Sequence, residues 1–198
     1  MFSFSIKNSD LDLLDTTIQE DEQVLEQLNN TIRLLGQELA CDYKLFTELL
    51  PEMLNQNSDR LFELGKGLAI GCTNLEQMWL EFYYALSSNL CIDTNNTQAL
   101  CGFFNVLTAR NNKLAKRILD QAVTDKVLAP IFMQLQTSVQ LDEQGVKRIR
   151  QSIQYGAVPI QQYVYIAYGR YHENISDNDY CEIMRDILLK DGFDIVLD

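Results

Sequence analysis

The sequence contains a single histidine, His172, so any site that needs two imidazole ligands is excluded. Three prolines and nine glycines interrupt 198 residues. No apolar run approaches the roughly 18 residues that a membrane-spanning helix needs. Basic residues are also scarce, because 16 Lys+Arg stand against 28 Asp+Glu and give a formal net charge of −12. A polyphosphate is repelled by such a chain as a whole, so we expect neither bulk nucleic-acid binding nor a membrane partner.

Cysteine is present but forms no recognisable pattern. The five cysteines are odd in number, are widely spaced and include no C-x-x-C pair (Cys41, Cys72, Cys91, Cys101, Cys181). With one histidine available, this predicts neither a zinc site nor a disulfide framework, but small apolar side chains in a reducing interior. The first seven residues lack the basic segment and apolar stretch of a secretory signal. We therefore expect a cytoplasmic protein.

Helical periodicity dominates what is present. Apolar residues recur at spacings of three and four, and no alternating strand pattern occurs. The first part of the chain predicts helices over 10–28, 31–40 and 43–56, the last of them kinked or split at Pro51. Shorter helices are predicted over 58–70, 73–86, 97–109, 112–124, 128–139, 142–155, 158–170 and 176–190. The fold class is therefore all-α.

The pattern of predicted helices changes near residue 58, where shorter helices separated by brief polar turns begin. Residues 1–57 predict acidic N-terminal helices, whereas residues 58–198 predict a region of helical repeats, and the two can belong to one continuous domain. Capping residues mark several helix starts. Thr73 with Glu76, and Ser176 with Asp179, have the spacing of a capping box, and Asp142 opens another helix.

Short sequence repeats accompany the paired helices. Lys116-Arg117-Ile118 recurs as Lys147-Arg148-Ile149, 31 positions later. In the preceding helices, similar large apolar pairs begin 28 and 33 positions apart: Phe104/Leu107, Phe132/Leu135 and Tyr165/Tyr168. One helix pair per period of this length is typical of a helical solenoid. An irregular helical bundle is the alternative.

These repeats resemble the broad class of HEAT-like and other α-α superhelical repeat proteins, over about residues 58–198. The resemblance implies antiparallel helix pairs stacked as a short right-handed α-solenoid of HEAT/ARM type, behind an acidic N-terminal helical segment. It also implies a protein-binding role, and it names no partner. The signatures of tetratricopeptide and ankyrin repeats are absent.

Two motifs that suggest chemistry have simpler explanations. Gly65-Lys66-Gly67 with Gly71 lacks the G-x-x-x-x-G-K-[ST] pattern of a phosphate-binding loop, and it indicates helices that approach closely. Asp177, Asp179 and Glu182 lack the ligand spacing of an EF-hand, and acids favour a helix N-terminus. A site built on these acids or on a cysteine paired with His172 is the weakest hypothesis. We predict a protein that is not an enzyme and has no cofactor or metal.

The positive charge is concentrated in one segment. Residues 1–60 have a net charge of −8, whereas residues 111–150 have a net charge of +3. Five cations of this segment, the basic row, lie at positions that stacked repeats would align on one face: Lys113, Lys116, Arg117, Lys147 and Arg148. Arg185 would extend the row. This predicts a surface for an acidic partner segment or a phosphate group, and an ordinary solvated face is the alternative.

Tyrosines form a second candidate surface. Tyr165, Tyr168 and Tyr171 follow one another at spacings of three, with Tyr163 nearby. A buried tyrosine needs a partner for its hydroxyl, and tyrosine is favoured at interface hot spots. These residues therefore predict a partner-binding face, and burial in the core is the alternative.

Two functions follow from the whole pattern. The first is a non-catalytic protein–protein interaction scaffold or adaptor built on helical repeats. The alternative is an acidic inhibitor or immunity-type protein that masks a basic toxin, nuclease or nucleic-acid-binding surface. The final residues, 192–198, start an apolar stretch without completing a helix pair. We therefore expect a piece of a larger protein, or a homo-oligomer or larger assembly.

Overall fold

The computed structural model describes residues 8–56, 58–88, 97–166 and 174–190, with side chains from residue 22 onward. These residues form helices and no strand, which confirms the all-α prediction. The elements are α1 (Asn8–Cys41), α2 (Tyr43–Asn55), α3 (Arg60–Gly71), α4 (Leu75–Ser88), α5 (Gln98–Arg110), α6 (Asn112–Ala122), η1 (Ala129–Ile131), α7 (Phe132–Thr137), α8 (Glu143–Tyr155), η2 (Ile160–Ile166) and α9 (Asp177–Leu188). Within the described ranges, none of the helices combines the length and the apolar character required to cross a membrane.

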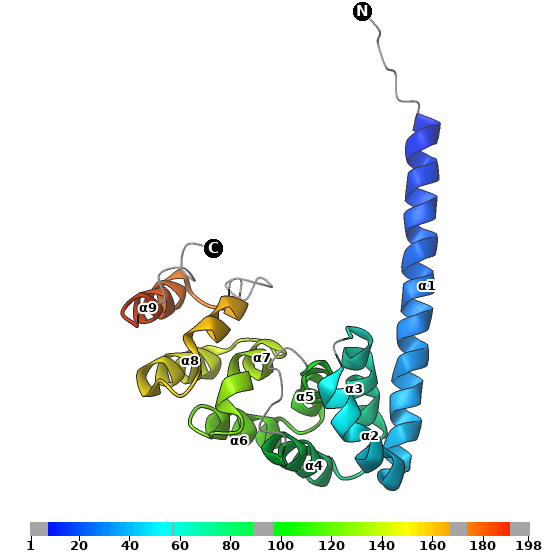
Figure 1. The fold of residues 1–198 in the computed structure, drawn as a ribbon. Coiled ribbons are helices and arrows are strands. Elements are labelled where there is room, and N and C mark those ends of the chain that lie inside the picture. Colours follow the sequence, from blue (N-terminus) through cyan, green and yellow to red (C-terminus); the bar gives the residue numbers. More distant parts are fainter. Residues whose placement is uncertain (1–7, 57, 89–96, 167–173, 191–198) are drawn as a thin grey trace, which may run out of the picture.

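Helix α1 is one continuous helix of 34 residues, so the predicted break between 28 and 31 is wrong. The polar residues at that point bond within the helix. Thr31 donates to the carbonyl of Gln27 over 2.9 Å, and the Asn30 side chain accepts from Arg33 over 3.0 Å. At 1.5 Å per residue the helix is about 50 Å long, and its N-terminal part extends beyond the other helices (Figure 1).

Helix α2 decides between two expectations for Pro51, a kink or a split. It continues from Tyr43 to Asn55 with Pro51 inside it, so the proline does not split the helix. Phe46, Leu50, Met53 and Leu54 are all buried on its inner side. We attribute the continuity to this burial, which offsets the hydrogen bond that proline cannot donate.

The predicted helix starts are confirmed at two of three positions. Asp142 accepts from the backbone N–H of Gly145 over 2.8 Å, and Ser176 accepts from that of Asp179 over 3.1 Å. The third start is wrong by one residue. Asn74, rather than Thr73, accepts from the N–H of Gln77 over 3.1 Å, because an amide oxygen is as good an N-cap acceptor as a hydroxyl.

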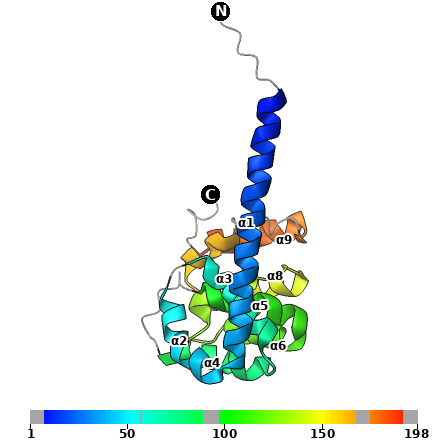
Figure 2. The same cartoon turned by 90° about the vertical axis from the view of Figure 1, so that its right-hand side faces the viewer.

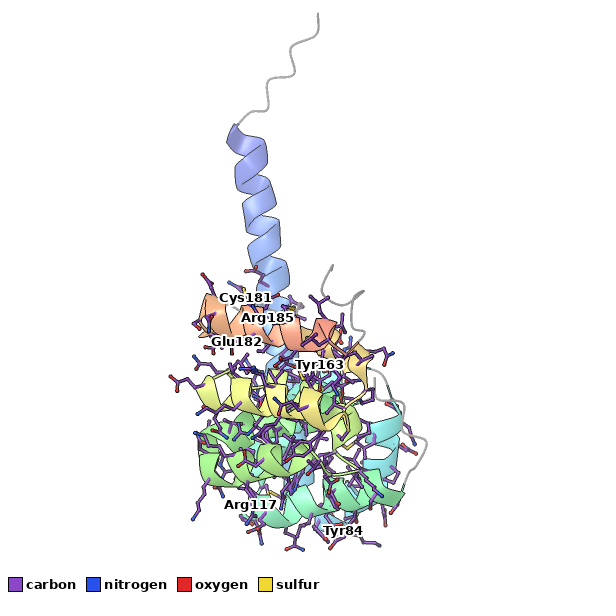
Figure 3. All side chains as sticks on the ribbon, turned by 90° about the vertical axis from the view of Figure 1, so that its left-hand side faces the viewer. Tyr84, Arg117, Tyr163, Cys181, Glu182 and Arg185 are labelled. Carbon is purple, nitrogen blue, oxygen red and sulfur yellow. The ribbon has the colours of Figure 1, made fainter. Side chains whose placement is uncertain are left out.

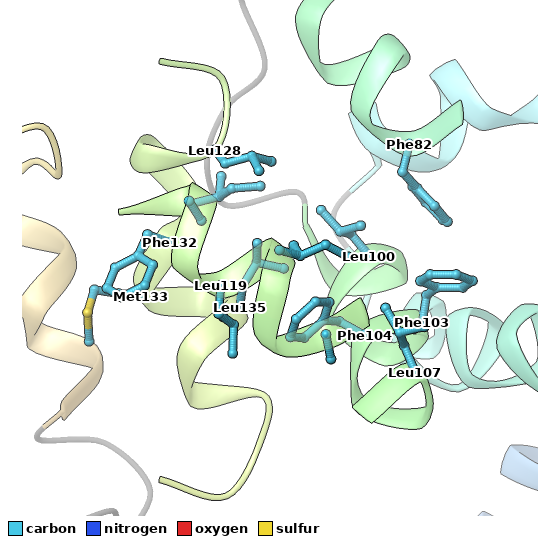
Figure 4. Close-up of a cluster of buried hydrophobic side chains, with 14 of the residues drawn as sticks. Phe82, Leu100, Phe103, Phe104, Leu107, Leu119, Leu128, Phe132, Met133 and Leu135 are labelled. Atoms are coloured by element: carbon cyan, nitrogen blue, oxygen red, sulfur yellow. The ribbon is translucent and has the colours of Figure 1, made fainter. Parts of the chain in front are cut away.

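One succession of helices packs side by side: α1 contacts α3, α3 contacts α5, α5 contacts α7, and α7 contacts η2. Helix α2 contacts α4, α6 contacts both α5 and α7, and α8 contacts α9. An aromatic and aliphatic core lies between the helices, where Phe82 lies 5.2 Å from Phe103 between ring centroids (Figure 4). Trp79 lies 6.1 Å from Phe104 in the same core.

Glycines permit the closest helix contacts. A Cβ atom on Gly67 of α3 would lie 2.1 Å from the Arg33 carbonyl oxygen and 2.8 Å from the Cα of Gly36, both in α1. On the other side of α3, a Cβ on Gly65 would lie 1.9 Å from the Ala99 carbonyl oxygen. Backbone therefore packs on backbone across both interfaces. This confirms the prediction that these glycines serve close helix approach.

A charged cluster joins α1 to α3 beside the glycines. Glu63 accepts from Arg33 over 2.6 Å and from Lys66 over 2.7 Å. Burial raises the pKa of Glu63, but the hydrogen bonds from Lys66 and Arg33 outweigh it and hold the pKa below its ordinary value. The carboxylate thus stays ionised between the two cations at neutral pH, and its contribution to stability is lost as the pH falls through its lowered pKa.

We predict that Gly102→Ala destabilises the protein. The new Cβ would lie 1.9 Å from the Phe62 carbonyl oxygen, and neither backbone can yield locally. The expected loss is about 2–3 kcal/mol in the free energy of unfolding, measured by urea titration, after alanine's better helix propensity is allowed for.

The matched control for this change is Gly145→Ala. Its new Cβ would meet the flexible ends of Leu141 and Gln136, which can move aside. We expect a change within about 1 kcal/mol there. Equal losses of unfolding free energy in the two variants would contradict the close backbone contact between α3 and α5 at Gly102.

Candidate functional site

Arg148 lies apart from the rest of the basic row. Its side chain is 2% exposed and donates to Asp120 over 2.7 Å, from α8 to α6. The expectation that it extends an exposed surface is therefore not met, because the guanidinium is enclosed between helices. It also borders a cavity of about 190 Å³ between α6, α7 and α8.

The other four cations of the basic row are exposed. Two of them bind carboxylates of neighbouring segments: Lys116 lies 3.7 Å from Asp142, and Arg117 donates to Glu76 of α4. Lys113 and Lys147 have no ion pair among the residues that the structure describes. Figure 3 shows Arg117 in the lower part of the helical body, at the end opposite to that beyond which α1 extends.

Ion pairs also join the last described helices. Arg150 of α8 donates to both Glu182 and Asp186 of α9, the latter over 2.7 Å. Figure 3 shows α9 with Glu182 and Arg185 stacked on α8. Glu182 is thus the ion-pair partner of Arg150. The backbone N–H of Asp179 donates to the hydroxyl of Ser176, which caps α9. The described residues contain no group of three His, Cys, Asp or Glu placed to hold a metal.

The tyrosines are only partly described. Residues 160–166 form a short 3-10 helix, whereas an α-helix over 158–170 was predicted, and Tyr168 and Tyr171 lie outside the described residues. Tyr163 is buried with its hydroxyl 2.8 Å from that of Ser152, and burial raises its pKa to about 12. Tyr165 is half-buried and accepts from Gln134 over 3.0 Å. It lines a cavity of about 320 Å³ that shares no residue with those bordered by the basic row.

The described cysteines divide into two kinds. Cys72 and Cys101 are buried, as predicted, whereas Cys41 and Cys181 are exposed, which the prediction missed. Burial raises the pKa of Cys72, and it raises that of Cys101 to about 11. The buried thiols are therefore protonated at neutral pH and are poor nucleophiles. His172 and Cys91 lie outside the described residues.

An apolar groove opens where α1, α2 and α3 meet. Its volume is about 590 Å³. Seven apolar side chains line it, together with three carboxylates and one amide: Leu35, Leu39, Leu45, Leu49, Met53, Leu61, Leu64, Glu38, Asp42, Glu52 and Gln56. We call this the α1–α2 groove. No cation is among the residues that line it. Lys44 of α2 pairs with Glu48.

The apolar surface continues along α1. Leu25 is 57% exposed and Leu35 is 59% exposed, and Leu28 between them is also exposed. Figure 2 shows α1 crossing one face of the helical body and extending beyond it. Large apolar side chains that stay exposed on a helix, next to an apolar groove, are typical of a protein-interaction surface.

This surface was not predicted from the sequence. The first helix was expected to end at residue 28, so Leu25 and Leu28 were not connected with Leu35. The available signal was the unbroken spacing of three and four through Ile32, Leu35 and Leu39.

Comparison with family models, with curated proteins and with solved structures found no match to this chain.

We predict that Asp120→Ala is costly for stability. The substitution leaves the buried guanidinium of Arg148 without its carboxylate, and about 2–3 kcal/mol of unfolding free energy should be lost. Since Asp120 itself is half-exposed, this value lies below that of a fully buried pair.

The control is Glu76→Ala, which removes the partner of the exposed Arg117. Both side chains of that pair are more than half exposed, so we expect a loss of no more than about 1 kcal/mol. Urea titrations of both variants make the comparison. Indistinguishable losses would mean that Arg148 is solvated.

Proposed function

We propose that the chain is a non-catalytic protein–protein interaction scaffold of the cytoplasm, built on helical repeats. The observation that carries this proposal is the α1–α2 groove, with the exposed leucines of α1 that continue it. Leaving such a surface in water costs about 25 cal/mol per Å² of apolar area, and a partner removes that cost. The exposed cations Lys113, Lys116, Arg117 and Lys147, with Tyr165, are the further proposed contacts.

The contacts between helices support the solenoid part of the proposal. Helices α1, α3, α5 and α7 pack in succession although each is two places from the next along the chain, and α2 packs on α4 in the same way, as expected of stacked repeats. The apolar positions that repeat in the sequence are also equivalent in burial, since Ile118 and Ile149 are buried, as are Phe104 and Phe132. The repeated arginines differ, because Arg117 is exposed and Arg148 is buried. We propose on this basis that α3–α9 form a short right-handed α-solenoid with α1 and α2 at one end.

The acidic charge favours a second candidate function. An acidic inhibitor that masks a basic surface would use the net charge of −8 over residues 1–60 and the carboxylates around the groove. The two candidates differ in how binding responds to salt. Masking by charge weakens steeply between low and high ionic strength, whereas an apolar contact does not.

Site-specific cross-linking tests the proposed function. A photo-crosslinking phenylalanine in place of Leu45 would lie in the groove, and one in place of Leu34 would lie on α1 outside it. Both side chains are exposed, so neither change disturbs the core. In cells of the source organism, we expect a discrete cross-linked partner at position 45 and at least about fivefold less at position 34.

The absence of any protein adduct at position 45 would contradict the proposed function, provided that the protein is folded in those cells. Equal adducts at both positions would also contradict it, because they indicate random collision. Circular dichroism of the purified variants checks their folding.

A further inference from the structure

We infer that the α1–α2 groove binds one basic amphipathic α-helix of a partner protein. This inference rests on the proposed function and names the class of partner. Three features of the described residues carry it: the spacing of the apolar side chains on α1, the composition of the groove, and the sign of the charge around both.

The spacing indicates a helical occupant. Leu25, Leu28, Ile32, Leu35 and Leu39 follow one another at intervals of three and four along α1. This is the a/d pattern with which one helix packs lengthwise against another. Gly36 of α1 makes the closest contact with α3. Of the stripe, Leu25, Leu28 and Leu35 are exposed, Ile32 is half-buried and Leu39 is buried at the base of the groove. The three exposed leucines are therefore available to a further helix.

The groove gives the stripe a second wall. Leu45, Leu49 and Met53 of α2 face Leu35 and Leu39 of α1 across the groove. A helix lying on α1 would thus place its apolar residues between two helices at this end. Anchors at i, i+3 or i+4, and i+7 are the usual way in which an amphipathic helix fills such a groove.

The charge identifies the flanks of the occupant as basic. Residues 8–32 contain seven acids and no base: Asp10, Asp12, Asp15, Glu20, Asp21, Glu22 and Glu26. Glu38, Asp42 and Glu52 continue the negative charge around the groove. Lys and Arg on the two sides of the partner's apolar face would meet the carboxylates of Glu38, Asp42 and Glu52, and attraction by the acidic N-terminal segment as a whole raises the association rate.

The same charge argues against two other occupants. A second copy of α1 would bring the same seven acids against themselves, which is unfavourable along a helix pair. The chain's own residues 191–198 contain apolar residues, but also three acids and no base. A basic helix from another protein is the occupant that satisfies both the apolar stripe and the charge.

Peptide binding to the full chain tests this inference. The probe is a synthetic fluorescent peptide of about 15–20 residues, long enough to form a helix, with leucines on one face and lysines elsewhere. One control peptide has glutamate in place of every lysine, and a second has glutamine in place of every leucine. Fluorescence anisotropy is measured at two salt concentrations, and we expect binding of the Leu/Lys peptide alone.

Groove variants locate the binding site. Leu35→Glu and Leu45→Glu should weaken binding by about tenfold or more, because each places a carboxylate in the apolar contact. Leu34→Glu is the matched control, since Leu34 is as exposed as Leu35 but does not line the groove. It should leave affinity within about twofold. A purely electrostatic attachment would instead be strengthened by all three changes.

Charge reversal tests the partner's sign. Glu38→Lys combined with Glu52→Lys should weaken the Leu/Lys peptide and allow the Leu/Glu peptide to bind. Glu143→Lys of α8, an exposed acid far from the groove lining, is the control and should change neither.

Three results would overturn the inference. They are equal effects of Leu34→Glu and Leu35→Glu, binding of the Leu/Glu peptide by the unaltered chain, and no binding of any peptide. A dimer of the free chain that Leu35→Glu dissolves, seen by sedimentation, would replace the partner helix with a second copy. In each case a partner cross-linked at position 45 in the cell experiment would still support the proposed function. Failure of this inference can therefore be told apart from failure of the proposed function.

Discussion

The approach of α1, α3 and α5 through glycine is the constraint on which the rest of the structure depends. Gly36 and Gly67 bring α1 and α3 together at backbone distance, and Gly65 and Gly102 do the same for α3 and α5. Packing this close leaves no room for large side chains between the helices. Leu35 and Leu39 of α1 therefore lie beside the glycine contact with α3, where they form one wall of the α1–α2 groove.

Ion pairs between helices are concentrated in the later part of the chain, whereas the excess of negative charge lies in the first part. Over α4, α6, α8 and α9, cations bind carboxylates of neighbouring helices, as Arg117, Arg148 and Arg150 do. Much of the positive charge is thus used to join successive helices. Among the described acids of α1 and α2, Glu48 pairs with Lys44, whereas Glu38, Asp42 and Glu52 have no ion pair with another described residue. The molecule consequently presents an apolar groove with an excess of negative charge beside it.

Most of the helices could be predicted because apolar periodicity and capping residues are local signals. Asp142 and Ser176 start helices where their side chains can accept backbone N–H groups. The groove could not be predicted, since it depends on how α2 folds back beside α1. Arg148 shows the same limit: its repeat with Arg117 is visible in the sequence, but one side chain is buried and the other exposed. The spacing of residues in the sequence predicts that they lie on the same face of a helix. It does not predict whether a neighbouring helix packs over that face.

The most direct test of the account is methyl NMR of leucine-labelled chain titrated with a basic amphipathic helix. The account predicts that the methyl signals of Leu35, Leu45 and Leu49 shift together and saturate with one helix per chain, while that of Leu34 stays in place. Shifts confined to α6 and α8, around Lys113 and Lys147, would contradict it. They would place the binding surface on the basic row and leave the α1–α2 groove without a function.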